Sequence, residues 1–342
     1  MITILSKIKK AGLVGRGGAG FPTAFKWSSV AKALEDKGNE KCYIICNAAE
    51  GEPGVKKDYY ILTHFPERVI DGIKIALNFL SASNKEKKIK VKAFIYLNSK
   101  YFNKLAPRLR LFIKEAPIEI FKKPSAAGYI GGEETSVLNA LEGRRIEPRL
   151  RPPYPTTHGL FGQPTLVNNV ETFYDISLIA ADEYDGRRFY TISGDCFWNG
   201  VYYFSENWTI EKILKETDNW PQFPFFVQVG GEAAGEVLNS RQLRRPVSGS
   251  GSITVYSLAK HKPRELVKKW VEFFYNQSCG QCTPCREGTY RLREILESKD
   301  PDWTTFNLLL ENLTQTAFCG LGGAVPTPLQ SFQKNVLPLY KK

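Results

Sequence analysis

The sequence predicts an α/β fold that continues into a small α+β module and ends in helices. Three observations support this prediction. Apolar runs typical of β-strands alternate with segments of helical spacing in the first half of the chain. Short β-type runs dominate the next stretch, and only helical patterns follow residue 263. Because 342 residues are enough for two or three domains, we divide the chain into domains at 1–186, 187–262 and 263–342.

The first domain is expected to contain a largely parallel sheet, because strands and helices that alternate at this spacing form α/β layers. The proline-rich stretch 149–164 is expected to be an irregular loop, since proline fixes φ and removes a backbone donor. Ser99 is the expected N-cap of the second helix. The expected strands are 41–46, 89–97 and 118–121, and the expected helices are 66–80, 98–114, 136–141 and 166–181.

The second and third domains differ in their periodicity. Pro326 and Pro328 are expected to end the helical part. The expected strands of the α+β module are 189–193, 200–204, 225–229 and 252–256, with a helix at 209–215, and the expected helices of the last domain are 263–277, 284–297 and 303–316.

The composition excludes several classes of protein. Apolar residues make up 42% of the chain and charged residues 24%, as in a globular protein rather than a disordered one. No run approaches the roughly 18 apolar residues that cross a bilayer, so direct membrane insertion is not expected. The N-terminus places apolar residues before lysines, the reverse of a signal peptide. A net charge of +12 implies an acidic partner, which could be nucleic acid, an anionic cofactor or an acidic protein surface.

Four cysteines form the strongest chemical signal. Cys279, Cys282 and Cys285 are separated by two residues each, and Cys319 follows as a distant fourth. Four thiolates at this spacing suit a [4Fe–4S] cluster. The alternatives are zinc, which prefers two separated pairs of ligands, and cysteines without a metal, which the polar turn between them disfavours. Clustered thiols also indicate a reducing compartment.

A glycine-rich segment, GRGGAGFP at 15–22, is the second signal. Gly15, Gly17 and Gly18 allow backbone amides to approach a phosphate or an extended polar ligand. Phe21 offers an aromatic face, and Lys26 a cation. The segment matches neither the P-loop nor the G-x-G-x-x-G pattern, so a plain turn, with Phe21 in the core, is the alternative.

Polar residues follow the first predicted strand. Asn47, Glu50 and Glu52 come directly after it, and ligands of parallel α/β sheets bind at the carboxyl ends of strands. A solvated turn is the alternative. Cys42 and Cys46 share strand parity and are interpreted as core thiols rather than ligands.

Two further segments combine carboxylates or amides with a helix start. Glu133 and Glu134 follow GYIGG just before the helix 136–141, where they could bind ribose or nicotinamide amide groups, or could cap the helix. Asn168 and Asn169 form an amide pair that suits a flavin or a base edge, with a helix cap as the alternative.

Together these segments resemble the NADH-oxidising flavoprotein subunit of respiratory complex I and its relatives, the diaphorase subunits of NAD-reducing hydrogenases and NAD-dependent formate dehydrogenases. The resemblance extends from Gly12 to Phe332. It rests on six motifs in the family's order: GRGGAGFPT at 15–23, CNAAEGEPG at 46–54, GYIGGEET at 128–135, PRLRPPYP at 148–155, GLFGQPTLVNNVET at 159–172 and SCGQCTPCREG at 278–288.

The resemblance implies a Rossmann-like FMN domain, a small ubiquitin-like β-grasp domain and a C-terminal helical bundle that carries a [4Fe–4S] cluster. It implies hydride transfer between NADH or NADPH and FMN, followed by one-electron transfer to the cluster, without a side chain acting as general acid or base. By match to the family motifs, FMN would be held by Gly15, Gly17, Gly18, Lys26, Asn47, Tyr129, Gly132, Asn168 and Asn169; NADH would face Phe21, Glu50, Glu52, Glu133, Glu134 and Tyr154; and the cluster ligands would be Cys279, Cys282, Cys285 and Cys319.

The resemblance also implies partners and a location. We expect a thioredoxin-like [2Fe–2S] subunit and a further iron–sulfur subunit as partners, in the cytoplasm or at the inner face of the membrane within a complex. GLGGAVP at 320–326 is more similar to the hydrogenase and formate dehydrogenase relatives than to complex I. The alternative from another class is a non-enzymatic iron–sulfur protein that binds nucleic acid, but the basic residues are scattered and no base-stacking motif is present.

The chain departs from the family pattern at several points. Ala49 stands where the family usually has Asp, which removes one polar contact to flavin or nicotinamide. Tyr154 stands where the family usually has Phe, and it can still stack on adenine. We also expect the chain to lack an N-terminal segment of the family and the ferredoxin-like extensions of some relatives, and expect a trimmed helical bundle between Cys285 and Cys319.

Overall fold

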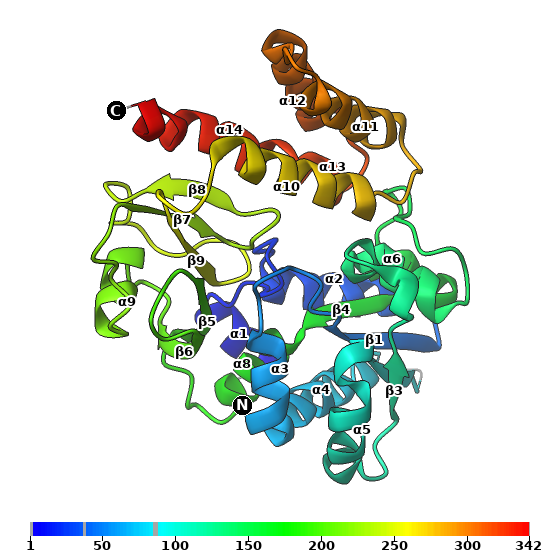
Figure 1. The fold of residues 1–342 in the computed structure, drawn as a ribbon. Helices are drawn as coiled ribbons and strands as arrows, with labels where there is room; N and C mark the ends of the chain where they lie inside the picture. Colours follow the sequence, from blue (N-terminus) through cyan, green and yellow to red (C-terminus); the bar gives the residue numbers. More distant parts are fainter. Residues whose placement is uncertain (1–2, 37–38, 85–87, 342) are drawn as a thin grey trace. The chain divides into compact units, whose positions relative to one another are not determined.

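The structure, a computed structural model, describes residues 3–36, 39–84 and 88–341 (Figure 1). The chain forms two compact units, one of residues 1–51 and 56–188 and the other of residues 52–55 and 189–342. The second unit contains both the second sheet and the C-terminal helices. The division into three domains stays a prediction.

The first unit is built on a four-stranded parallel sheet. Its strand order is β3-β2-β1-β4, so the chain adds β2 and β3 on one side of β1 and then crosses to add β4 on the other. The topological switch point therefore lies between β1 and β4. The strands are β1 (Lys41–Ala48), β2 (Lys90–Leu97), β3 (Ile118–Lys122) and β4 (Thr165–Asn169).

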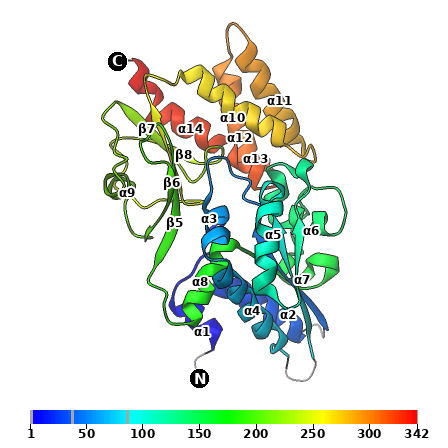
Figure 2. The ribbon, with the colours of Figure 1, turned by 60° about the horizontal axis from the view of Figure 1, so that its bottom comes forward.

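Helices cover both faces of this sheet. On one face α4 (Pro66–Ser81) and α8 (Val170–Ala180) lie side by side (Figure 2), and Gly72 of α4 lies directly against the backbone of Phe173 in α8. A side chain larger than hydrogen at Gly72 would separate the two helices. On the other face, α6 (Glu134–Leu141) packs its apolar side chains against Ile45 of β1 and Val167 of β4. A parallel sheet buried on both faces explains the apolar runs Tyr43–Cys46 of β1 and Ala93–Leu97 of β2.

Further helices and 3₁₀ turns complete the first unit. They are α1 (Ile4–Lys10), α2 (Thr23–Asp36), α3 (Lys57–His64), α5 (Ser99–Ile113), α7 (Pro155–His158) and the 3₁₀ turns η1 (Ser125–Ala127), η2 (Ile130–Gly132) and η3 (Leu160–Gly162).

The sequence predicted the first three strands and the helix 66–80 correctly, but three local predictions are wrong. The segment 166–181 is not one helix, because its first residues form β4 in register with β1. The proline-rich stretch 149–164 is not wholly irregular, since Pro155 occupies the first turn of α7, where a missing N–H has no cost. The N-cap of α5 is Asn98 rather than Ser99: the Asn98 side chain accepts a hydrogen bond from the Lys100 amide.

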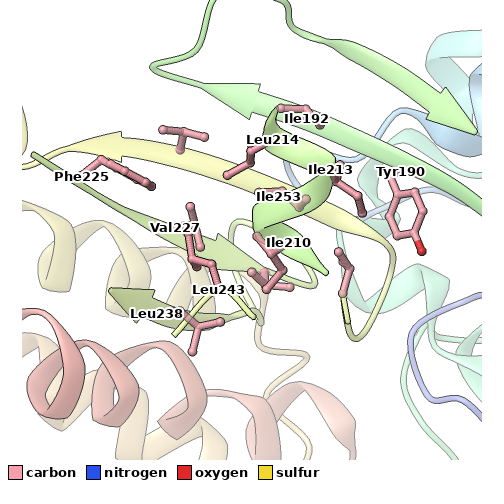
Figure 3. Packing of buried hydrophobic residues seen from close by; sticks show 13 residues of the cluster. Tyr190, Ile192, Ile210, Ile213, Leu214, Phe225, Val227, Leu238, Leu243 and Ile253 are labelled. Carbon is pink, nitrogen blue, oxygen red and sulfur yellow. The ribbon is translucent and has the colours of Figure 1, made fainter. Parts of the chain in front are cut away.

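The second unit contains a five-stranded mixed sheet in the order β6-β5-β9-β7-β8. Figure 3 shows Ile210, Ile213 and Leu214 of α9 directed toward the strands of this sheet. The predicted strands are present, but β8 was not predicted because it is a four-residue edge strand. The elements are β5 (Arg187–Gly194), β6 (Gly200–Ser205), α9 (Ile210–Glu216), β7 (Phe225–Val229), β8 (Glu236–Asn239) and β9 (Ser252–Ser257).

Helices follow this sheet to the end of the described chain. The predicted helices 263–277 and 303–316 match α10 and α12. The predicted helix 284–297 matches α11, which begins one residue earlier, at Thr283. Pro326 and Pro328 do not end the helical part: they lie in the first turn of α14, whose Ser331 accepts a hydrogen bond from the Val237 amide of β8. The elements are α10 (Pro263–Gln277), α11 (Thr283–Glu297), α12 (Trp303–Thr316), α13 (Gly320–Ala324), α14 (Pro326–Asn335) and η4 (Leu337–Lys341). Among the described residues, every helix is too short or too polar to cross a membrane.

Candidate cofactor sites

The candidate flavin site lies at the carboxyl ends of β1 and β4. These two strands flank the topological switch point of the sheet, the place where open parallel sheets bind ligands. Asn47 and Asn169 are register partners at that edge. Two residues predicted from separate motifs are thus brought together by strand pairing.

The glycine-rich segment forms a closed loop with an exposed tip. The Gly15 amide donates to the Phe21 carbonyl at 2.8 Å, which closes the base of the loop. Gly18 and Gly20 have φ values of +115° and +63°, which favour glycine. Gly17 needs no such conformation, and a Cβ there would meet only the Asn169 Cβ, at 3.5 Å. The backbone conformation at Gly17 therefore does not require glycine. The missing side chain instead leaves the backbone of the loop accessible to a ligand.

Arg16 anchors this loop to α8. Its amide donates to Thr172 Oγ1 at 3.0 Å, and its Nε donates to Asp175 Oδ2 at 3.1 Å. Arg16 is only 3% exposed although it stands among four glycines. Burial and the charge of the neighbouring Glu171 raise the pKa of Asp175 to about 8, against the opposing effect of Arg16. Arg16 was not predicted as a site residue, although a cation inside a glycine run is visible in the sequence.

Lys57 lies at the centre of a second buried network. Its Nζ is within 3.0 Å of three oxygens, one each from Asp58, Glu171 and Asn169. Burial alone lowers the pKa of Lys57, but the carboxylates of Asp58 and Glu171 raise it above its ordinary value. Lys57 is therefore a buried ammonium whose three donors match three acceptors. Sequence reasoning did not identify it, because nothing local distinguishes it from the adjacent Lys56.

Asn169 is fixed by this network. Its Oδ1 accepts from Lys57 Nζ and from the Glu171 amide, which makes Asn169 the N-cap of α8. Its Nδ2 donates to Asp58 Oδ2 at 2.7 Å. Asn168 has a similar internal role, since its amide oxygen accepts from Trp27 Nε1 at 3.0 Å. Asn169 is thus a helix cap, as in the alternative drawn from the sequence. The side-chain amides of Asn168 and Asn169 both form hydrogen bonds within the protein.

Asn47 ties the end of β1 to the loop that contains Tyr129 and Gly132. Its Nδ2 donates to the Gly132 carbonyl at 2.9 Å, and its Oδ1 accepts from the Ala49 amide at 3.2 Å. Asn98, a residue that sequence reasoning placed only in a helix, donates to the Ala49 carbonyl at 2.7 Å. Ala49 is 2% exposed, so a methyl group fills the place of the family's Asp.

Tyr129 packs against the chain that leaves β1. A Cβ at Gly51 would lie 3.4 Å from the Tyr129 carbonyl oxygen and 3.6 Å from its ring. Gly51 therefore lets the 128–132 loop approach the β1 end closely.

The two adjacent glutamates have different partners. Glu133 Oε2 accepts from the amides of Thr135 and Ser136 at 2.9 Å, so Glu133 is the N-cap of α6. Glu134 Oε1 accepts from Lys26 Nζ at 2.7 Å. Arg151, which was not selected from the sequence, lies 3.2 Å from Glu133 Oε1 and 3.7 Å from Glu134 Oε2. Lys26 and Arg151 therefore add positive charge beside both carboxylates.

Glu50 and Glu52 belong to different units. Glu50 Oε1 and Oε2 accept from the Asp58 and Tyr59 amides at the start of α3, at 2.6 and 3.2 Å. Burial and the charge of Asp58 raise the pKa of Glu50 to about 8. Glu52 lies in the second unit, where its Oε1 accepts from the Ala233 amide at 2.8 Å.

Two aromatic residues predicted to face the nucleotide are exposed. Phe21 is 44% exposed and Tyr154 is 57% exposed. Phe25, in the first turn of α2, makes an edge contact with Phe21 at 5.7 Å between ring centres. The exposure of Phe21 excludes the alternative that it is an ordinary core residue.

These features suit FMN. The glycine tip leaves room for a phosphate, and Phe21 supplies an aromatic face, whereas the cations Lys26 and Arg151 are each paired with a carboxylate. In addition, the Thr23 hydroxyl beside the loop is buried and has no hydrogen-bond partner among the described residues. All the residues predicted to bind FMN lie in the first unit.

The four predicted cluster ligands lie in the second unit: three are at two helix starts, and Cys279 is in the connection between α10 and α11. Cys282 is the N-cap of α11 with Cys285 in its first turn, and Cys319 is the N-cap of α13. Gly322 of α13 packs onto Cys285: a Cβ at Gly322 would lie 3.3 Å from the Cys285 Cβ. Helix N-termini favour negative charge, which suits thiolates bound to a cluster.

The thiols share one electrostatic environment. Burial and the charges of Cys282, Cys319 and Cys279 raise the pKa of Cys285 to about 11, against the lowering effect of a hydrogen bond with Ser278. A [4Fe–4S] cluster is bound by four cysteine thiolates, and Cys279, Cys282, Cys285 and Cys319 supply such a donor set. Cys42 and Cys46 are fully buried, as predicted for core thiols.

Comparisons with known proteins agree with this geometry. The Nuo51 FMN-binding domain family matches residues 8–178, and the NADH-ubiquinone oxidoreductase-F iron-sulfur binding region matches residues 265–341. A subunit of the NADH-quinone oxidoreductase of Aquifex aeolicus is 33% identical, over 93% of this chain and 80% of the relative. NAD-reducing hydrogenase HoxS subunit alpha of Cupriavidus necator is 30% identical, over 99% of this chain and 60% of the relative.

A solved structure supports the same relationship. A chain of NAD+-reducing [NiFe]-hydrogenase in the H2-reduced state superposes with a TM-score of 0.85 and 31% identity, over 97% of this chain and 60% of that one. This chain thus spans about three fifths of the hydrogenase subunits that it matches. The chain therefore belongs to the family of FMN- and iron–sulfur-binding NADH dehydrogenase subunits, whose members occur in NADH-quinone oxidoreductases and in NAD-reducing hydrogenases.

Proposed function

We propose that this chain is the subunit through which electrons enter or leave a multi-subunit redox complex at NAD(H). When bound, FMN exchanges a hydride with the nicotinamide and the [4Fe–4S] cluster carries single electrons. The chain's own residues bind and orient these groups and exclude competing reactions. The single observation that carries the proposal is the convergence of three predicted segments on the carboxyl ends of β1 and β4, beside an exposed glycine loop.

The division of labour among the residues follows from their contacts. We assign FMN contact to the exposed glycine tip, to Tyr129 and to the remaining amide capacity of Asn47. Asn169 acts indirectly, because its own amide is already bonded to Lys57, Asp58 and the Glu171 amide.

The nucleotide side is assigned to exposed or half-buried groups. Phe21 and Tyr154 offer rings for stacking. Glu134 lies among cations, and Glu133 holds α6 in place. NADPH would add a phosphate that Arg151 could pair with, so the two nucleotides should be compared directly.

Partners and location are inferred from the chemistry of the chain. The cluster needs a one-electron acceptor, so we propose the thioredoxin-like [2Fe–2S] subunit and a further iron–sulfur subunit as partners. Clustered thiols favour the cytoplasm. We propose the diaphorase of a hydrogenase or formate dehydrogenase as the parent assembly, on the GLGGAVP segment at 320–326, with complex I as the alternative. Affinity purification of the tagged chain and identification of the co-purifying subunits decides between them.

The experiment that tests the proposed function uses the reconstituted full chain. Acid release followed by chromatography should yield one FMN and no FAD, because one glycine-rich loop is present and no second dinucleotide fingerprint accompanies it. NADH should bleach the flavin spectrum. A preparation that contains iron and sulfide but takes up no flavin, or takes up FAD, would contradict the proposal and favour a non-enzymatic iron–sulfur protein.

A further inference from the structure

The segment 52–55 is held by the loop between β7 and β8, although the residues before and after it belong to the first unit. Glu52 Oε1 accepts from the Ala233 amide at 2.8 Å and from the Ala234 amide at 3.2 Å. The Glu232 amide donates to the Pro53 carbonyl at 3.2 Å. Three successive amides of one loop thus bind two successive residues of the segment.

Two glycines make this contact close. A Cβ at Gly231 would overlap the carboxyl group of Glu52, and a Cβ at Gly54 would overlap that of Glu232. Each glycine therefore faces a glutamate from the opposite segment. Because only a glycine leaves space there, Gly231 determines where the Glu52 carboxylate can lie.

The loop is itself held in place. Trp270 Nε1 donates to the Glu232 carbonyl at 3.1 Å, and Ser193 Oγ donates to Glu232 Oε1 at 3.3 Å. Trp270 is 1% exposed, so this support comes from the core of the second unit. A fixed loop can hold a carboxylate in one position, whereas a mobile one could not.

We propose that loop 231–235 is the positioning element for Glu52, and that through Glu52 it sets the affinity of the subunit for the nicotinamide nucleotide. The proposal rests on the proposed function and on the expectation, from the family motif and from the position of Glu52 after the carboxyl end of β1, that Glu52 faces NADH. Residues of the loop are positioning residues: they act through the Glu52 carboxylate. Two backbone donors to one carboxylate oxygen fix its direction.

The test is a double-mutant cycle between Glu52 and Gly231 in the full chain loaded with FMN and cluster. The variants are Glu52→Ala, Gly231→Ala and the double substitution. Gly230→Ala is the matched control. Gly230 also has a positive φ, +97° against +142° for Gly231, but a Cβ there would have 3.4 Å to its nearest neighbour. Both substitutions carry backbone strain, and only one displaces Glu52.

The readouts are the Kd for NAD+ by calorimetry, the FMN content and the melting temperature. We expect Glu52→Ala and Gly231→Ala to change the Kd in the same direction, each by about tenfold, which corresponds to one charged contact of about 1.4 kcal/mol. In the Glu52→Ala background, Gly231→Ala should change the Kd no further. Gly230→Ala should keep the wild-type Kd even if its melting temperature falls, and FMN content should stay unchanged throughout.

Each contrary result has its own meaning. If Gly231→Ala keeps the wild-type Kd while Glu52→Ala changes it, the loop does not position Glu52 and the inference is wrong. If the two effects add in the double variant, Gly231 acts by another route and the inference is also wrong. If Glu52→Ala leaves the Kd unchanged, the loop cannot act on the nucleotide through it. A wild-type protein that takes up FMN but binds no NAD+ would instead overturn the proposed function itself.

Discussion

The flavin region and the cysteine region of this chain are organised in opposite ways. In the flavin region the polar side chains are already bonded to one another: Lys57 meets three oxygens, and Arg16 joins the glycine loop to α8. In the cysteine region Cys285 is a buried thiol whose pKa is raised to about 11, surrounded by three more thiols. The flavin region is held together by hydrogen bonds and ion pairs within the protein. The cysteine region presents thiols that a cluster would bind together.

This difference shows what each cofactor contributes. A flavin site assembled from internal ion pairs should keep its shape without the flavin, since the buried charges are compensated within the protein. Thiols at helix starts must lose protons when a cluster binds, and the cluster then links α11 to α13. Loss of the cofactor should therefore disturb the second region more than the first.

Cys285→Ser should have the largest effect. A hydroxyl is a poor ligand for iron, so the cluster should be lost or severely impaired, while FMN stays bound in the other unit. The visible and EPR signals of the cluster should disappear. NADH should still reduce an artificial acceptor that takes electrons from the flavin, whereas transfer to the partner subunit should fall severely.

Cys196→Ser is the matched control, because Cys196 lies in the second unit outside the four-cysteine set. It should keep the cluster signal. If Cys285→Ser kept full transfer to the partner, the cluster would not be on the electron path. If it lost FMN as well, the two regions would not be independent.

Lys57→Met should have the next largest effect, and on the first region. Removal of a buried ammonium leaves Asp58 and Glu171 uncompensated, which costs about 3–5 kcal/mol of folding stability. Urea unfolding of the FMN-free protein, followed by circular dichroism, measures this loss. FMN uptake should weaken too, since Asn169 loses a bond.

The control is Lys92→Met. Lys92 pairs with Glu119 at 2.7 Å, but both side chains are about half exposed, so the cost should be about 0–1 kcal/mol. Equal losses for the two lysine variants would contradict the claim that the buried network holds the flavin region together.

Glu50 should make the stability of the first unit depend on pH. Its pKa is about 8 in the folded protein against an ordinary 4.5, so the folded state binds the proton more tightly than the unfolded state. The resulting stabilisation is complete below pH 4.5 and is lost as the pH rises toward 8. Thermal unfolding at several pH values should show stability falling over this range.

Glu50→Gln should flatten that pH dependence, because the amide does not titrate. A variant whose unfolding keeps the wild-type slope between these pH values would show that other groups, such as Asp175 with its raised pKa, account for it.

Gly17→Ala should have the smallest effect on folding, within about 0.5 kcal/mol. Gly17 has no positive φ, and a Cβ there would make an ordinary contact at 3.5 Å. FMN affinity should nevertheless fall if the phosphate approaches this backbone. Fluorescence titration with FMN, combined with thermal unfolding, separates the two effects; unchanged FMN affinity would place the phosphate elsewhere on the loop.

Patterns confined to a short window were predicted well from the sequence. The helix 263–277 and the strand 41–46 were predictable because their apolar periodicity and flanking residues are local. The four cysteines stand out by spacing alone. The prediction of a single helix over 166–181 was wrong because an apolar run is compatible with both a strand and a helix. Only the pairing with β1 decides between them.

By itself, the sequence determined the α/β class, the order of the motifs and the identity of the donors, since these depend on spacing and residue type. Only the tertiary structure decided which donors are already engaged. It showed Asn169 bonded to Lys57 and Glu133 capping α6, and it placed Glu52 with the second unit rather than with Glu50. The physical reason is that a hydrogen bond or a buried ion pair needs two groups within about 3 Å, and residues that are more than 100 positions apart in the chain, as Lys57 and Asn169 are, meet only when the fold brings them together.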